Sequence, residues 1–405
     1  MENTFLKNKL KFIYTPSENS ITSFTIGLNA GAIVEEKNEI GLAHVVEHMV
    51  FKGTKNRSEA EINSQCDEVF GFHNAMTNYP YVVYYGTCLS EDFERGLEIY
   101  SDILLNPAFE EEYFKEEISV ICEELKEWGD DTSQYCEDRV LFNGFTNRRI
   151  KSLIIGDEDT IKSFTIDDVK DFYNKHYIPN NCTISVVSSL SFEQVYKIID
   201  KYFSSWKEKH YERAEITYEE NVSGTFIEEK THINSCKIQY IYPMHNLNQR
   251  EVTLLRIFNS FFGEGTSSVL YDEIRTKRGL VYDISSKLKN ENGIKLYTIT
   301  LGTSKENINT SIEIINSEIE KIKNLNGYFT DEKIKDIIRS LKLKRILGLE
   351  KSIALSFNIC VFDIMYGDCN ILFNEYDMED INEDEILKTA NKILKKPTIQ
   401  IIKSK

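Results

Sequence analysis

Five consecutive residues, His44-Val45-Val46-Glu47-His48, constrain the fold of this chain more than any other part of the sequence. The flanking residues, Gly41-Leu42-Ala43 and Met49-Val50-Phe51, are small or apolar and include no proline, which favours a buried helix. On a helix, His44 and His48 are four residues apart and share one face, about one turn from each other. The fold must therefore bury a helix and still leave room beside its two imidazoles.

Two imidazoles at that spacing supply half of a tetrahedral zinc site. Glu47 lies on nearly the same face as His44, so its carboxylate can act as a general base toward a water molecule. The order is H-x-x-E-H, the inverse of the more common zinc-peptidase motif H-E-x-x-H. The alternative is that both histidines are core residues hydrogen-bonded to carbonyl groups, because short motifs also arise by chance.

An acidic segment downstream offers a third metal ligand. Residues 111–128 read EEYFKEEISVICEELKEW, and their apolar residues recur at spacings of four, three and four, which predicts an amphipathic helix. Helical phase places Glu117 and Glu124 together at the border of the apolar stripe, whereas Glu116, Glu123 and Glu127 face solvent. We therefore predict Glu124 as the third ligand and Glu117 as an auxiliary carboxylate of the catalytic site. The alternative is a solvated acidic face.

The chain resembles the insulinase and pitrilysin family of zinc peptidases, specifically the short branch that includes mitochondrial processing peptidase. One departure is Phe70, which stands where the family often has the first glycine of a pair. The residues that carry the resemblance are Gly41 to Met49, Phe51 to Thr54, Gly71, Asn74, Ala75, Thr77, Asn106, Pro107, Glu117, Glu123 to Leu125, Asp130 and Asp131.

The resemblance implies further site residues. It supports Glu124 as the zinc ligand, because the family's ligand precedes an aliphatic residue in this helix. Asn74 and Ala75 correspond to an edge strand that pairs with the bound peptide, although the local pattern, Asn74 to Thr77 before Tyr81 to Tyr85, predicts a turn that leads into a strand. Arg275 and Tyr282 correspond to the arginine and tyrosine that contact substrate in the family. Both side chains can donate hydrogen bonds to a developing oxyanion.

Strands grouped with long helices in each half predict an α+β fold with two similar α/β sandwich domains. We predict a metal-binding domain over residues 1–209, a polar linker over 210–224, and a second domain over 225–405 that contributes substrate contacts. The resemblance implies that such a chain is half of a four-domain clamshell around a chamber, so two chains must associate. The predicted elements are strands at 10–14, 21–28, 182–187 and 237–242 and helices at 192–203, 250–261, 305–324 and 331–347.

Composition excludes some classes of function. The formal charge of −17 argues against nucleic-acid binding. No run of 18 apolar residues is present to span a membrane, and the first residues lack the apolar core of a signal peptide. The eight cysteines form no C-x-x-C pair and indicate reduced thiols, hence a cytoplasmic protein. Residues 1–210 carry a net charge of −15 and residues 211–405 only −2, which favours either simple solubility or a preference for basic peptides.

From these features we predict a zinc-dependent endopeptidase that binds one Zn²⁺ per chain and hydrolyses short or unfolded peptides inside an enclosed chamber. A homodimer is the simplest assembly, because one chain contains both the metal motif and the Arg275/Tyr282 segment. Two alternatives remain: the catalytic subunit of a heterodimeric peptide-maturation protease, and a non-catalytic scaffold that encloses peptides.

Overall fold

The computed structural model describes residues 1–213, 215–322, 324–374 and 380–405. The chain forms two compact units, and each unit draws on both halves of the sequence. None of the helices in the described residues combines the length and the hydropathy that crossing a bilayer requires. The first unit comprises Met1–Lys126, Leu153–Ile216 and Arg345–Phe373, and the second comprises Glu127–Ser152, Thr217–Lys344 and Asn374–Lys405.

The first unit is built on a six-stranded sheet in the described part of the chain, with the strand order β1-β2-β6-β3-β5-β4. β2 and β6 are parallel, and every other neighbouring pair is antiparallel. β4 is an edge strand, since β5 is its single partner in the sheet among the described strands. The strands are β1 (Glu2–Phe5), β2 (Lys11–Pro16), β3 (Ile21–Leu28), β4 (Phe70–Thr77), β5 (Val82–Leu89) and β6 (Cys182–Ser188).

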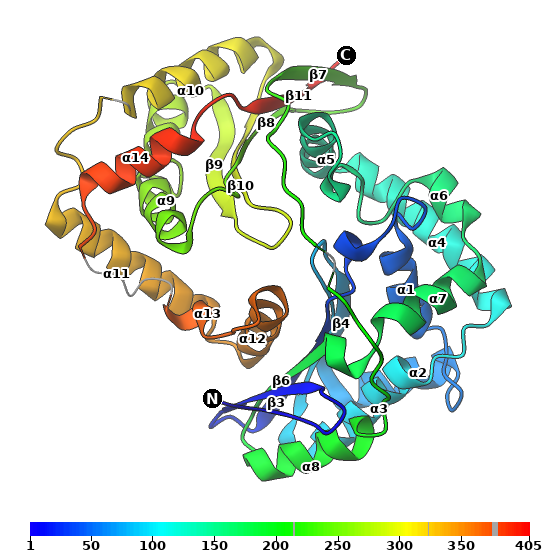
Figure 1. Ribbon diagram of the computed structural model, residues 1–405. Coiled ribbons are helices and arrows are strands. Elements are labelled where there is room, and N and C mark those ends of the chain that lie inside the picture. Colours follow the sequence, from blue (N-terminus) through cyan, green and yellow to red (C-terminus); the bar gives the residue numbers. More distant parts are fainter. Residues whose placement is uncertain (214, 323, 375–379) are drawn as a thin grey trace. The chain divides into compact units, whose positions relative to one another are not determined.

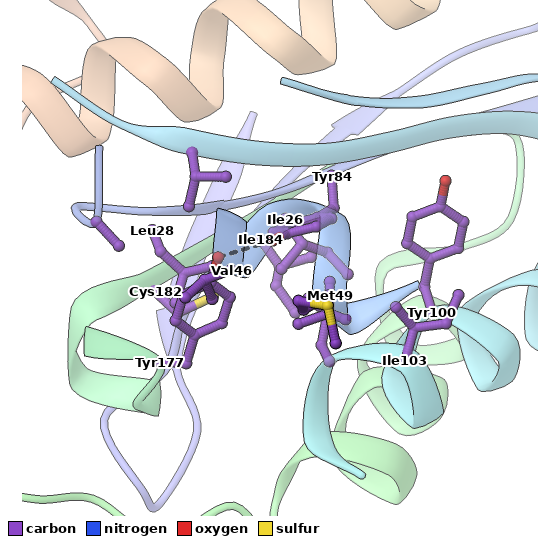
Figure 2. Packing of buried hydrophobic residues seen from close by; sticks show 14 of the residues in the cluster. Ile26, Leu28, Val46, Met49, Tyr84, Tyr100, Ile103, Tyr177, Cys182 and Ile184 are labelled. Atoms are coloured by element: carbon purple, nitrogen blue, oxygen red, sulfur yellow. Dashed lines mark hydrogen bonds between the residues drawn. The ribbon is translucent and has the colours of Figure 1, made fainter. Parts of the chain in front are cut away.

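Helices cover one face of this sheet and enclose the main core of the unit. Alternate residues of β3 and β6 point into this core, including Ile26, Leu28 and Ile184, and the apolar side of α1 packs onto them (Figure 2). Val46 and Met49 of α1 are fully buried there, so the motif helix is anchored by its apolar residues. The helices are α1 (Leu42–Val50), α2 (Glu59–Val69), α3 (Phe93–Leu105), α4 (Glu111–Asp130), α6 (Glu158–Ser163), α7 (Ile166–His176) and α8 (Phe192–Phe203).

The opposite face of the same sheet is covered by α12 (Ser352–Tyr366), which comes from the C-terminal part of the chain (Figure 1). The residues that β3 presents on this face are small or polar, so the helix approaches that strand closely. A Cβ atom at Gly27 would lie 2.3 Å from Cδ1 of Ile364 and 2.7 Å from Sγ of Cys360. The Ser356 hydroxyl donates to Oγ1 of Thr25. A short helix, α13 (Ile371–Asn374), follows.

The second unit repeats this topology. Among the described residues its sheet has five strands in the order β7-β11-β8-β10-β9, which matches β2-β6-β3-β5-β4 strand for strand, and β7 and β11 are its parallel pair. β9 therefore corresponds to β4, and α9 corresponds to α1. The strands are β7 (Gly224–Lys230), β8 (Cys236–Pro243), β9 (Val281–Lys289), β10 (Leu296–Thr303) and β11 (Thr398–Ser404), and the helices are α5 (Thr132–Gly144), α9 (Gln249–Phe262), α10 (Ile308–Ile322), α11 (Asp331–Gly348) and α14 (Glu383–Ile393).

A reciprocal exchange of helices explains why neither unit is continuous in sequence. α5 lies in the N-terminal half of the chain but packs on β8 and β11 of the second unit. α12 lies in the C-terminal half but packs on the equivalent strands of the first unit, β3 and β6. The two similar α/β sandwiches predicted from the sequence are thus confirmed, whereas the boundaries at 209/210 and 224/225 stay predictions.

The predicted elements match the structure closely, with one correction. The strand at 21–28 and the helix at 192–203 have the predicted bounds, and the others shift by three residues or fewer at either end. The turn predicted at Asn74 to Thr77 is wrong, because these residues form the end of β4. The reversal occurs later, where the Asn78 N–H donates to the carbonyl of Tyr81 across Pro80.

Candidate metal centre

The motif helix α1 is fixed at its N-terminus by a buried carboxylate. Oε1 of Glu35 accepts hydrogen bonds from the backbone N–H groups of Gly41 and Ala43, at 3.2 Å and 2.9 Å. An acid at a helix N-terminus also interacts favourably with the helix dipole. Gly41 has φ +100°, and an added Cβ would lie 2.6 Å from the carbonyl oxygen of Ile155, so glycine is required where the helix begins.

Three side chains predicted as metal ligands come together in the first unit. One potential ligand atom from each of His44, His48 and Glu124 lies within 4.8 Å of the other two. Nε2 of His44 is 3.7 Å from Oε1 of Glu124, and Nε2 of His48 is 3.6 Å from Oε2. Ligands at about 2.0–2.1 Å from a tetrahedral zinc ion stand roughly 3.4 Å apart, so these residues fit that ion.

Helical phase separates the acids of α4 as the sequence predicted. Glu117 is buried and Glu124 is partly buried, whereas Glu123 is exposed and accepts a hydrogen bond from Lys126 at 2.6 Å. Glu116 and Glu127 are also exposed. Glu117 and Glu124 are seven residues apart, close to two helical turns, so both can approach the same region of α1.

Glu117 holds the ring of His48 rather than joining the three ligands. Nδ1 of His48 and Oε1 of Glu117 are 2.7 Å apart, which leaves Nε2 of His48 directed at Glu124. A carboxylate behind a histidine in this way fixes the ring and its tautomer for metal binding. The second oxygen of Glu117 lies 2.7 Å from Nζ of Lys52. Lys52 also forms an ion pair with Glu59, at 2.8 Å.

The two histidines have opposite pKa shifts. Burial, together with the nearby His48, lowers the pKa of His44 to about 3, so this ring is neutral at neutral pH. Burial also acts to lower the pKa of His48, but the hydrogen bond to Glu117 and the surrounding carboxylates outweigh it and raise that pKa. The pKa of Glu117 is lowered, because its bonds to His48 and Lys52 outweigh its burial.

Glu47 is partly buried beside the three ligand residues. The Thr77 hydroxyl, at the end of β4, donates to Oε2 of Glu47 at 2.7 Å. Burial raises the pKa of Glu47, while the hydrogen bond from Thr77 opposes that shift. The sequence assigned no role to Thr77 or Lys52, although both belong to the family resemblance. Lys52 follows the end of α1 by two residues, and its place in the family resemblance is the signal that could have indicated a role.

Asn74 and Ala75 lie on the edge strand β4. The Ala75 N–H donates to Oδ1 of Asn74 at 2.9 Å, and the Asn74 side chain is exposed. His73, on the same strand, lies near the hydroxyl of Tyr100 and is not among the clustered ligand atoms of the described residues. Phe70, which departs from the family pattern, fits the structure because its buried ring packs against Gly86 and Gly96. A Cβ atom added at either glycine would lie within 3.1 Å of the Phe70 ring.

Arg275 and Tyr282 belong to the second unit. Arg275 lies in a π-helical turn, Tyr271–Thr276, and its guanidinium stands 5.0 Å from the centre of the Tyr271 ring. Tyr282 is on the edge strand β9 with 63% of its surface exposed. Both side chains are exposed, and their relation to the metal residues stays a prediction.

A duplicated α+β fold with an H-x-x-E-H helix and a glutamate from a second helix defines a class of metallopeptidases. Residues 13–158 match the family model described as insulinase, peptidase family M16, and residues 163–341 match the model described as the peptidase M16 inactive domain. The chain therefore belongs to peptidase family M16. The second description agrees with α9, which corresponds to α1 but carries no histidine.

Individual relatives agree with this assignment. A protein from Rickettsia bellii described as an uncharacterized zinc protease is 28% identical over 97% of this chain and 96% of its own length. A probable mitochondrial-processing peptidase subunit beta from Arabidopsis thaliana is 29% identical over 50% of this chain and 38% of its own. The crystal structure of a protease from Helicobacter pylori has a TM-score of 0.87 at 22% identity and covers 99% of both chains, which shows a shared fold.

Proposed function

We propose that this chain is a zinc-dependent endopeptidase that hydrolyses short or unfolded peptides. The observation that carries the proposal is the convergence of ligand atoms of His44, His48 and Glu124 within 4.8 Å, next to the partly buried carboxylate of Glu47. Two histidines and one carboxylate leave one position of a tetrahedral ion open, as in catalytic zinc sites. The zinc proteases among its relatives support zinc as the cofactor, and the one ligand cluster found among the described residues supports one ion per chain.

Glu47 is the general base in this proposal. When bound, zinc would polarise the scissile carbonyl and make a nearby water more acidic. Glu47 takes a proton from the attacking water and returns it to the leaving amine nitrogen. Burial raises its pKa and so strengthens it as a base, and the Thr77 hydroxyl fixes the direction of its carboxylate. Glu117 contributes by orienting His48.

The backbone of β4 is the proposed binding surface for the peptide. An extended peptide adds a strand to a sheet edge, and its main-chain groups then pair with those of the edge strand. Asn74 and Ala75 would provide these contacts, since a peptide carbonyl can replace the Asn74 side chain as the acceptor for the Ala75 N–H. Arg275 and Tyr282 would donate hydrogen bonds to the peptide near the scissile carbonyl.

We further propose that the active form is a cytoplasmic homodimer that encloses the peptide in a chamber. The heterodimer remains the alternative, and the relative named as a processing-peptidase subunit favours it. A preference for basic peptides is supported by the net charge of −15 on residues 1–210, against −2 on the remainder.

The test compares metal content with turnover. The purified chain should contain about one zinc per chain and should cleave an internally quenched, unstructured peptide, whereas Glu47→Gln should keep the zinc and lose the activity. Light scattering of the same sample gives the oligomeric state. A wild-type chain that binds zinc and peptide without cleaving any peptide of a mixed-sequence set would indicate the scaffold instead.

A further inference from the structure

The residues of β4 divide between two environments. Thr77 bonds to Glu47, and Ala75 packs against the core that contains α1, so odd-numbered residues of β4 face the metal helix. Met76 packs with residues of α12, and Phe72 contacts Tyr85, so from Phe72 onward the even-numbered residues face the α12 side. An irregularity in the register between Phe70 and Phe72 places Phe70 in the core instead. A peptide strand added to this edge would alternate in the same way, because successive side chains of a strand point to opposite faces.

The α12 side of this edge carries a row of aromatic rings. The ring centres of Phe72 and Tyr85 are 5.9 Å apart, and those of Tyr85 and Phe357 of α12 are 5.4 Å apart in an edge-to-face arrangement. Tyr81 continues the row, with its ring centre 6.3 Å from that of Phe357. All four residues belong to the first unit, so their arrangement does not depend on the second.

Phe72 is the exposed end of this row of rings. Its side chain is 49% exposed, whereas Tyr85 and Phe357 are partly buried and Tyr81 is buried. The exposed ring stands two residues from Asn74 and three from Ala75, on the edge strand, and no described strand pairs with the outer side of β4 there. An exposed aromatic beside an open strand edge offers apolar area and ring contacts to whatever pairs with that edge.

We propose that Phe72, with Tyr85 and Phe357, forms a specificity subsite for an aromatic or large aliphatic side chain of the peptide. The proposal rests on the peptide-binding role proposed for β4. The occupant is the peptide residue that lies alongside Phe72 and points toward α12, away from the metal. Because the paired backbone fixes the register, this preference applies to one position at a fixed distance from the cleaved bond.

The test uses peptides that differ only at one position, with phenylalanine, leucine, alanine or aspartate placed there in turn. For the wild-type chain, kcat/KM should favour phenylalanine over alanine by about two- to tenfold at one position, the range expected for an aromatic contact. Phe72→Ala should remove most of that preference, so that its kcat/KM values for the phenylalanine and alanine peptides become nearly equal. Phe142→Ala is the matched control, since Phe142 is 46% exposed and lies on α5 in the other unit.

A binding measurement separates failure of the subsite from failure of the proposed hydrolysis. Fluorescence anisotropy with the metal-free chain should show tighter binding of the phenylalanine peptide to wild type than to Phe72→Ala. If peptides bind with this preference but none is cleaved, the hydrolysis is wrong and the subsite stands. If wild type and Phe72→Ala cleave and bind all peptides alike, the subsite is wrong. Absence of both binding and cleavage would overturn both.

Discussion

At the residue scale, the protonation of His48 should control zinc affinity. The raised pKa of His48 means that this ring holds a proton at a higher pH than an ordinary histidine, and a protonated Nε2 cannot bind metal. Zinc affinity should therefore be greatest above that pKa. It should fall as the pH drops through the pKa, because one proton competes with the zinc ion for the His48 ring. His44, with a pKa of about 3, contributes nothing to this dependence near neutral pH.

Glu117→Gln tests this assignment, because the variant removes the carboxylate that raises the pKa of His48. Chelator competition between pH 5.5 and 8 should show the acid loss of zinc affinity displaced to lower pH in the variant. At pH 8 the affinity should be about 10- to 100-fold weaker, since the carboxylate also orients the ring. An unchanged pH midpoint would mean that Glu117 does not set the protonation of His48.

Thr77 is predicted to position the base. Thr77→Val removes the hydroxyl that donates to Glu47, and a hydrogen bond to a charged group contributes about 1.5–3 kcal/mol, so kcat should fall by about tenfold or more. Zinc content should not change, and Thr77→Ser should restore most of the activity. Thr87→Val is the control, because its hydroxyl contacts Ser23 on the α12 side of the sheet. Equal losses of activity in both valine variants would refute a specific role for Thr77.

At the scale of elements, α12 packs so closely on β3 that added side-chain volume between them should lower the stability of the first unit. Gly27→Val would force atoms against Ile364 and Cys360 and should destabilise by about 1–3 kcal/mol in urea unfolding. Gly129→Val should change stability by less than about 0.5 kcal/mol, because nothing lies within 4 Å of a Cβ at Gly129. Equal stability of the two variants would show that α12 does not pack as described.

The elements also show how far the sequence determines the fold. Local periodicity sufficed to predict α4 and the separation of Glu124 from Glu123, because helical phase depends on neighbours a few residues away. The exchange of α5 and α12 between the two sheets could not be predicted, since it pairs segments roughly 100 residues apart or more, as in the packing of α5 on β8 and the bond from Ser356 to Ser185. Asn74 was assigned to a turn because asparagine favours turns locally, and pairing with Tyr85 overrides that tendency.

At the scale of the whole molecule, we predict that two chains share each active site. Arg275 and Tyr282 should serve the zinc of the partner chain, so inactive Glu47→Gln chains mixed with inactive Arg275→Ala chains should recover activity. A mixed dimer then contains one site with both native residues. Recovery should approach a quarter of the wild-type rate after full exchange, because about half of the dimers are mixed and each has one active site of two. No recovery after demonstrated exchange would place Arg275 at the zinc of its own chain, or exclude it from catalysis.

The central claim is that His44, His48 and Glu124 hold zinc while Glu47 acts as the base. The most direct test is zinc content per chain, measured by mass spectrometry after dialysis, for wild type and four variants. Glu47→Gln and Glu123→Ala should retain about one zinc per chain, whereas His48→Ala and Glu124→Ala should lose most of it. Loss of zinc from Glu123→Ala together with its retention in Glu124→Ala would contradict the account.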